Sequence, residues 1–109
     1  MPEPHATLRQ LGRFSEPALL ILVSLADGPK HGYAMLEDIE LLAGVRLGPG
    51  TLYGALARLE RLGLIAALPP TERRRPYRLT QAGATVLRSE LAGWQTITST
   101  GLRRLEVPA

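Results

Sequence analysis

The sequence predicts a mainly α-helical fold that carries one small β-hairpin, and three observations support this prediction. Apolar residues recur at helical spacing in three segments before residue 63. Two short apolar segments, 64–70 and 76–80, flank the charged stretch TERRR as the strands of a hairpin flank a turn. A long segment with heptad spacing begins at residue 81. Three helices, a hairpin and one more helix, in this order, predict a winged helix-turn-helix with a long C-terminal helix.

The first two predicted helices differ in how much of their surface is apolar. Ser15 is suited to cap the first helix, and the apolar run 18–26 indicates that this helix is buried on nearly all sides. Gly28 and Pro29 break it. The second helix is expected at about residues 32–42. Its buried face is predicted to consist of Tyr33, Leu36, Ile39 and Leu42.

The third predicted helix has a buried side and an opposite side of small and basic residues. Pro49 is suited to its first position and Gly63 to its end. Its buried side comprises Leu52, Ala55, Leu56 and Leu59, and its opposite side gathers Gly50, Thr51, Gly54, Ala57, Arg58 and Arg61. Interior glycines destabilise a helix by about 1 kcal/mol each relative to Ala. We therefore expect these glycines to serve the close approach of the helix to another surface, with a phosphate at its N-terminus.

Positive charge is concentrated around the third helix and the hairpin. The chain has a net charge of +3, whereas residues 46–78 alone carry seven arginines against two glutamates. Three consecutive arginines, 73–75, occupy the predicted hairpin turn, where no core could cover them. Such a distribution is typical of a surface that binds a polyanion. Double-stranded DNA is the predicted partner, and the alternative is a winged-helix interaction module that binds an acidic partner protein.

Composition excludes several other kinds of site. The chain has no cysteine, which excludes disulfides and zinc–thiolate centres. Its two histidines, His5 and His31, are separated and no carboxylates are usefully paired, so no catalytic residue, metal site or cofactor is predicted and the chain is not expected to be an enzyme. No apolar run approaches the ~20 residues of a membrane span. The segment MPEPHATLRQ lacks the layout of a signal peptide, so we expect a cytoplasmic protein without membrane contact.

The last predicted helix carries a stripe at alternating steps of four and three, which consists of Leu87, Leu91, Trp94, Thr98, Gly101 and Leu105. Thr80 is expected to cap this helix, which extends from Gln81 to about Leu105. The stripe is long enough to pair two helices, although the helix could instead fold back onto its own domain. Trp94 is expected to pack at the interface or to form one wall of a cavity for a flat hydrophobic effector. The residues assigned to a homodimer interface or effector site are Leu87, Leu91, Trp94, Thr98 and Leu105.

Taken in order, three segments resemble the PadR-type transcriptional regulators: LLILVSLADGPKHGYAM, GPGTLYGALARLERLGLI and RRRPYRLTQAGATVL. The resemblance extends from about residue 15 to residue 91 and is closest to the compact branch with a single C-terminal dimerisation helix. It implies a dimeric repressor of a neighbouring gene that responds to a ligand or to stress. Gly48 and Gly54 depart from the family pattern, in which a capping residue and a Pro are common, so a less rigid third helix is expected.

The resemblance also assigns roles by position. Thr51 and Tyr53 are expected at the DNA backbone, His31 and Tyr33 at the start of the second helix, and arginines 73–75 in the wing. We expect three parts: a flexible arm at 1–14, a winged helix-turn-helix domain at 15–80, and a dimerisation helix with a short tail at 81–109. The full set predicted to contact DNA is Lys30, Tyr33, Pro49, Gly50, Thr51, Tyr53, Gly54, Arg58, Arg61, Arg73, Arg74 and Arg75.

Overall fold

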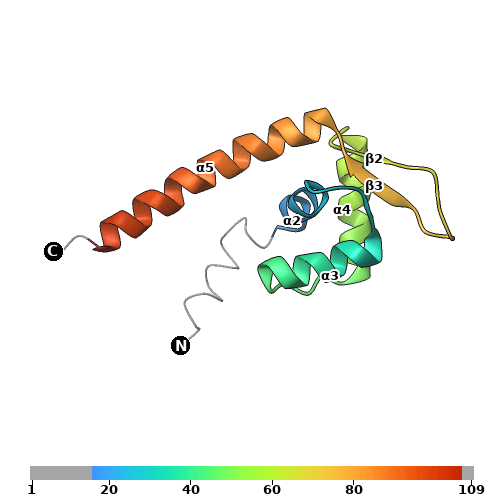
Figure 1. The fold of residues 1–109 in the computed structure, drawn as a ribbon, viewed down its shortest axis with the longest axis horizontal. Helices are drawn as coiled ribbons and strands as arrows, with labels where there is room; N and C mark the ends of the chain where they lie inside the picture. The colour runs from blue at the N-terminus through green and yellow to red at the C-terminus, as the bar shows by residue number, and fades with distance from the viewer. Residues whose placement is uncertain (1–15, 107–109) are drawn as a thin grey trace.

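The computed structural model describes residues 16–106, and this part of the chain contains four helices and three short strands (Figure 1). In chain order they are α2 (Pro17–Leu25), β1 (Lys30–His31), α3 (Gly32–Ala43), α4 (Pro49–Arg61), β2 (Ile65–Ala67), β3 (Pro76–Leu79) and α5 (Gln81–Glu106). The predicted winged helix-turn-helix with a long C-terminal helix is confirmed. The predicted arm at 1–14, the predicted cap Ser15 and the end of the tail lie outside the described residues.

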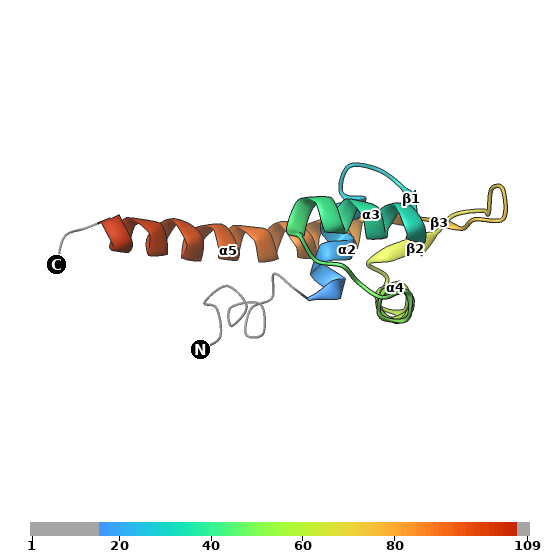
Figure 2. The same ribbon diagram turned by 90° about the horizontal axis from the view of Figure 1, so that it is seen from below.

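A single core holds α2, α3, α4 and the start of α5 together. α2 is buried on most sides, as predicted, because α3, α4 and α5 surround it (Figures 1 and 2). It begins at Pro17, and Glu16, rather than the predicted Ser15, occupies the N-cap position without a side-chain hydrogen bond. The core consists of Leu19, Leu20, Ile21, Leu22, Leu25, Met35, Ile39, Leu52, Ala55, Leu56, Leu59, Ile65 and Leu87.

The buried face of α3 differs from the predicted one. Met35 and Ile39 are fully buried, whereas Tyr33 is 64% exposed and Leu42 is 47% exposed. The prediction was wrong for Tyr33 and Leu42 because apolar residues occur on several sides of this helix, so that spacing alone allows more than one face. Packing of α3 against α2 selects the face of Met35.

The sheet has three strands in the order β1–β3–β2, so the predicted hairpin of β2 and β3 gains a third, antiparallel strand. β1 contains only Lys30 and His31, which pair with Tyr77 and Pro76. Two residues are too few to show the alternation by which strands are recognised in a sequence. This extra strand attaches the wing to the start of α3.

The wing ends in a tight turn, as the TERRR stretch predicts. Thr71 and Arg74 exchange two backbone hydrogen bonds of 2.8 Å, which leaves Glu72 and Arg73 as the two turn residues. Their φ angles are +50° and +67°. Positive φ at both positions is what a type I′ turn requires, and the twist of this turn matches that of the flanking strands.

The end of α4 and the start of α5 are hydrogen-bonded to each other. Gly63 ends α4 with a φ of +76°, as predicted. Thr80 caps α5, as predicted, because its Oγ1 accepts from the Gly83 N–H at 3.0 Å. The same hydroxyl donates to the Gly63 carbonyl at 2.7 Å, so one side chain connects the two helix ends.

Only the first turns of α5 pack onto the core. Leu87, which was assigned to the dimer interface, is 5% exposed and belongs to the core, so that assignment was wrong. Beyond it the helix projects away from the other described elements as an arm (Figures 1 and 2). Leu91 is about half exposed and Leu105 is 84% exposed. The stripe of Leu87 therefore continues along a part of the helix that the described core does not cover.

Candidate nucleic-acid interface

The exposed side of α4 is made of small residues and arginines, as predicted. Gly50, Gly54, Ala57 and Arg61 are all exposed, and nothing lies within 4 Å of a Cβ built at either glycine. No contact within the described residues therefore explains these glycines. Pro49 occupies the first turn, and the N-cap Gly48 offers no side-chain acceptor, so the first N–H groups of the helix are open to an outside acceptor.

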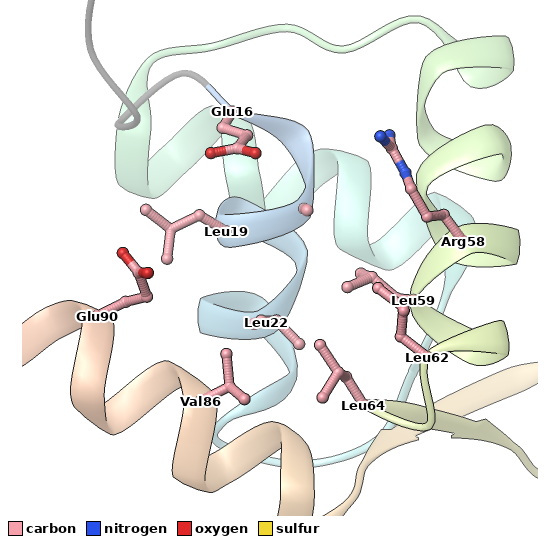
Figure 3. A pocket seen from close by; sticks show the side chains of 10 residues that line it. Glu16, Leu19, Leu22, Arg58, Leu59, Leu62, Leu64, Val86 and Glu90 are labelled. Carbon is pink, nitrogen blue, oxygen red and sulfur yellow. The ribbon is translucent and has the colours of Figure 1, made fainter.

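Tyr53 and Arg58 lie on opposite flanks of this side of α4. The Tyr53 ring covers Gly32 at the start of α3, where an added Cβ would lie 2.6 Å from the tyrosine oxygen. Arg58 extends on the other flank toward α2 (Figure 3). A molecule that lay along α4 would thus meet a tyrosine on the wing side and an arginine on the α2 side.

A cleft of about 260 Å³ brings together the predicted residues of α3, α4 and the wing. It is lined by His31, Gly32, Tyr33, Tyr53, Arg73, Arg74, Arg75 and Tyr77. Tyr77 was absent from the predicted set, although the YRLT motif contains it. Burial, and secondarily the Glu60 carboxylate, raises the pKa of the Tyr77 hydroxyl, so this group remains a neutral donor at physiological pH. The cleft offers guanidinium and hydroxyl donors to an anion.

The three wing arginines have different surroundings. Arg73 lies in the turn itself. Arg74 places Nη1 3.0 Å from Nε2 of His31, the residue that precedes α3. Arg75 donates from Nη1 to the Leu68 carbonyl at 3.4 Å. All three remain exposed, so each retains N–H groups that can reach an outside anion.

Lys30 has a structural role in addition to its predicted contact with DNA. Its ammonium forms an ion pair with Asp27 and donates to the Ser24 carbonyl, and its side chain is 18% exposed. The hydrogen bond and charge of Lys30 lower the pKa of the Asp27 carboxyl. Two of the three N–H donors of this ammonium thus serve the turn between α2 and β1, and one is left for an outside anion.

An apolar cavity of about 230 Å³ lies between α2, α4 and α5 (Figure 3). Charged side chains surround its apolar walls: Glu16 of the N-cap of α2, Glu90 of α5 and Arg58 of α4. Trp94 is not part of it and is half-buried further along α5. Its remaining lining residues are Ala18, Leu19, Leu22, Leu59, Leu62, Leu64 and Val86. The cavity connects the exposed side of α4 with the packed end of α5.

Residues 16–106 contain no group of three or more histidine, aspartate or glutamate side chains that could hold a metal ion. In the same range no helix combines the length and the hydropathy that crossing a membrane requires.

The fold and this basic interface together define a winged helix-turn-helix protein of the class that regulates transcription. Residues 21–89 match the model of the Transcriptional regulator PadR-like family, and the chain belongs to this family.

The chain is also similar to individual proteins. The chain is 51% identical over 78 residues to an uncharacterized 37.1 kDa protein in a transposon of Streptomyces fradiae, covering 72% of this chain and 23% of that protein. It is 39% identical over 72 residues to a transcriptional regulator of Mycobacterium tuberculosis, covering 63% of this chain and 66% of that one. The chain thus spans less than two thirds of the length of either. The crystal structure of a PadR family transcriptional regulator from Eggerthella lenta superposes with a TM-score of 0.73 at 29% identity, covering 95% of this chain and 93% of that one.

Proposed function

We propose that the chain is a DNA-binding repressor that acts as a homodimer and is released from its operator by a small-molecule or stress signal. The observation that carries this proposal is the cleft in which Tyr33, Tyr53 and the wing arginines meet beside the exposed side of α4. In a winged helix-turn-helix this helix enters the major groove. The wing then lies on or in the adjacent minor groove.

Each part of α4 has a distinct role in this arrangement. Gly50 and Gly54 let the helix approach the DNA closely, and the open N–H groups after Pro49 bind a phosphate. Arg58 contacts base edges, because it is exposed on the α2 flank and arginine pairs well with guanine, whereas the exposed Thr51 contacts the backbone at the start of the helix. Tyr53, on the other flank, contacts the backbone together with the cleft.

Dimerisation is assigned to α5. Beyond the buried Leu87, its stripe comprises the exposed Leu91, Thr98 and Leu105 and the half-buried Trp94. A second copy would cover the same residues of each helix, as a symmetric dimer requires. Two DNA-binding units would then read two half-sites of one operator.

The effector, in this proposal, is a small hydrophobic molecule that binds along α5. Trp94 forms one wall of its site, and the neighbouring apolar cavity contacts both α5 and Arg58 of α4. Occupation there would change the surroundings of a base-contacting arginine. Titration of a hydrophobic compound into the protein–operator complex, followed by DNA release and by the fluorescence of the single tryptophan, tests this step.

The experiment that tests DNA binding replaces the three wing arginines. Arg73, Arg74 and Arg75 changed together to Ala should weaken binding to all duplex sequences, because phosphate contacts carry no sequence information. The log–log dependence of affinity on salt should become less steep by about one for each lost phosphate contact. Operator DNA is obtained by selection from random duplexes with the wild-type protein.

A matched variant controls for net charge. Arg88, Arg103 and Arg104 on α5, changed together to Ala, remove the same charge away from the cleft and should leave the salt dependence nearly intact. Equal slopes for the wing variant and the wild type would contradict the wing assignment. Salt-sensitive binding to an acidic protein without any DNA binding would support the interaction-module alternative instead.

A further inference from the structure

The side chain of His31 contacts two different parts of the molecule. His31 is the N-cap of α3, and its Nδ1 accepts from the Ala34 N–H at 3.3 Å. Its other ring nitrogen, Nε2, lies 3.0 Å from Nη1 of Arg74 in the wing. One imidazole therefore lies between the start of the helix-turn-helix and the wing.

A neutral imidazole cannot accept at both nitrogens. The guanidinium of Arg74 has only N–H donors, and so does the backbone amide of Ala34. A neutral imidazole has one nitrogen with a lone pair and one that carries a proton, and the imidazolium form has no acceptor at all. His31 therefore satisfies either the cap of α3 or the hydrogen bond to Arg74, and the position of one proton decides which.

The contact leaves Arg74 able to bind an anion. A guanidinium has five N–H donors, and one of them reaches His31. Arg74 and His31 both line the cleft that contains Tyr33 and Tyr53, so the remaining donors lie next to the surface assigned to the DNA backbone. A long side chain that is already oriented loses less conformational entropy when it binds.

We propose that His31 is a positioning residue of the DNA interface: with its proton on Nδ1, it accepts from Arg74 and holds this arginine toward a backbone phosphate. This inference rests on the proposed DNA-binding function. Binding of a phosphate to Arg74 favours the Nδ1–H form of His31 and releases the Ala34 N–H from its cap. Loss of Arg74 favours the Nε2–H form, in which Nδ1 caps α3.

The first measurement needs no DNA. Nitrogen-15 spectra of the imidazole rings in the free protein at about pH 8, where an ordinary imidazole is neutral, report which nitrogen carries the proton. The His5→Gln variant identifies the signals of His31. Arg74→Ala should move His31 toward the Nε2–H form, whereas Arg88→Ala, an arginine on α5, should not. An unchanged His31 spectrum in Arg74→Ala overturns the inference.

The second measurement uses duplex DNA and a double-mutant cycle. His31→Asn keeps a good N-cap acceptor but is too short to reach Arg74, so it should lower DNA affinity by roughly two- to tenfold with the thermal stability preserved. In an Arg74→Ala background, the same change should have no further effect on affinity. His31→Ala should lower both affinity and stability, because it also removes the cap.

The outcomes separate this inference from the proposed function. If His31→Asn weakens DNA binding equally with and without Arg74, His31 does not act through Arg74 and the inference is overturned. If the wild-type chain does not bind DNA, the proposed function fails, and the spectra of the free protein still decide whether Arg74 controls the proton of His31.

Discussion

Gly83 determines how closely α5 can lie on the rest of the fold. A Cβ added there would be 2.0 Å from the Leu64 carbonyl oxygen and 2.8 Å from Cδ1 of Leu79. The carbonyl cannot move aside easily, because it accepts from the Thr80 N–H at 3.1 Å. The backbone approach at Gly83 therefore depends on the absence of a side chain.

Gly83→Ala should lower the free energy of unfolding by about 1–3 kcal/mol or more, as expected when a buried site is overpacked. Urea unfolding at one fixed protein concentration measures this change. Gly93→Ala is the matched control in the same helix, where no atom lies within 4 Å of the added Cβ. That variant should gain about 0.5–1 kcal/mol from helix propensity. A Gly83→Ala variant as stable as the wild type would disprove the close contact.

At the scale of elements, glycines on the exposed side of α4 lower its helix propensity, although its packing on the core does not need them. Its buried side of Leu52, Ala55, Leu56 and Leu59 is continuous, and a well-formed C-terminal motif ends it at Gly63. Its exposed side nevertheless keeps Gly50 and Gly54, where a larger residue would meet nothing in the described chain. The glycines are explained if the exposed side lies against DNA.

Gly54→Ala should therefore change stability and DNA binding in opposite directions. The free energy of unfolding should rise by about 0.5–1 kcal/mol, because Ala favours the helix. DNA affinity should fall several-fold, because the added methyl group separates α4 from the groove. Denaturant unfolding and a DNA titration on the same preparation measure both, with Gly93→Ala as a control that is stabilised without loss of affinity. Unchanged affinity would show that Gly54 does not face the DNA.

Element boundaries were largely predictable, because local hydrogen bonds and φ angles determine them. Pro49 begins α4, and Thr80 caps α5 through an amide only three residues away. β1 and the buried face of α3 were not predictable, since pairing with β3 and packing on α2 involve residues far away in the chain.

The candidate site was predictable in part. Tyr33, Tyr53 and the wing arginines were each predicted and are found in one cleft. The ammonium of Lys30, another predicted residue, forms an ion pair with Asp27, three residues before it. The contact between His31 and Arg74 joins residues that only the folded wing brings together. Residue type was enough to select candidates, and the fold decides which of them have their donors available.

In the whole molecule, α5 extends the protein to 58 Å along its longest axis (Figures 1 and 2). The same helical stripe is buried at Leu87 and exposed at Leu105, within one uninterrupted helix. In this structure the helix therefore does not fold back onto its own domain. Exposed apolar residues at regular helical spacing are typical of a surface that pairs with another helix.

Trp94→Glu should consequently separate the dimer before it unfolds the domain. An aromatic side chain of this size buries about 150–250 Å², and at ~25 cal/mol per Å² this is several kcal/mol as an upper bound. A symmetric dimer loses two copies at once. Sedimentation should show monomers. The helical content should remain largely intact, and binding to a two-half-site operator should be lost. Ser99→Glu, which adds the same charge to an exposed position off the stripe, should remain dimeric. A dimeric Trp94→Glu variant would place the interface elsewhere.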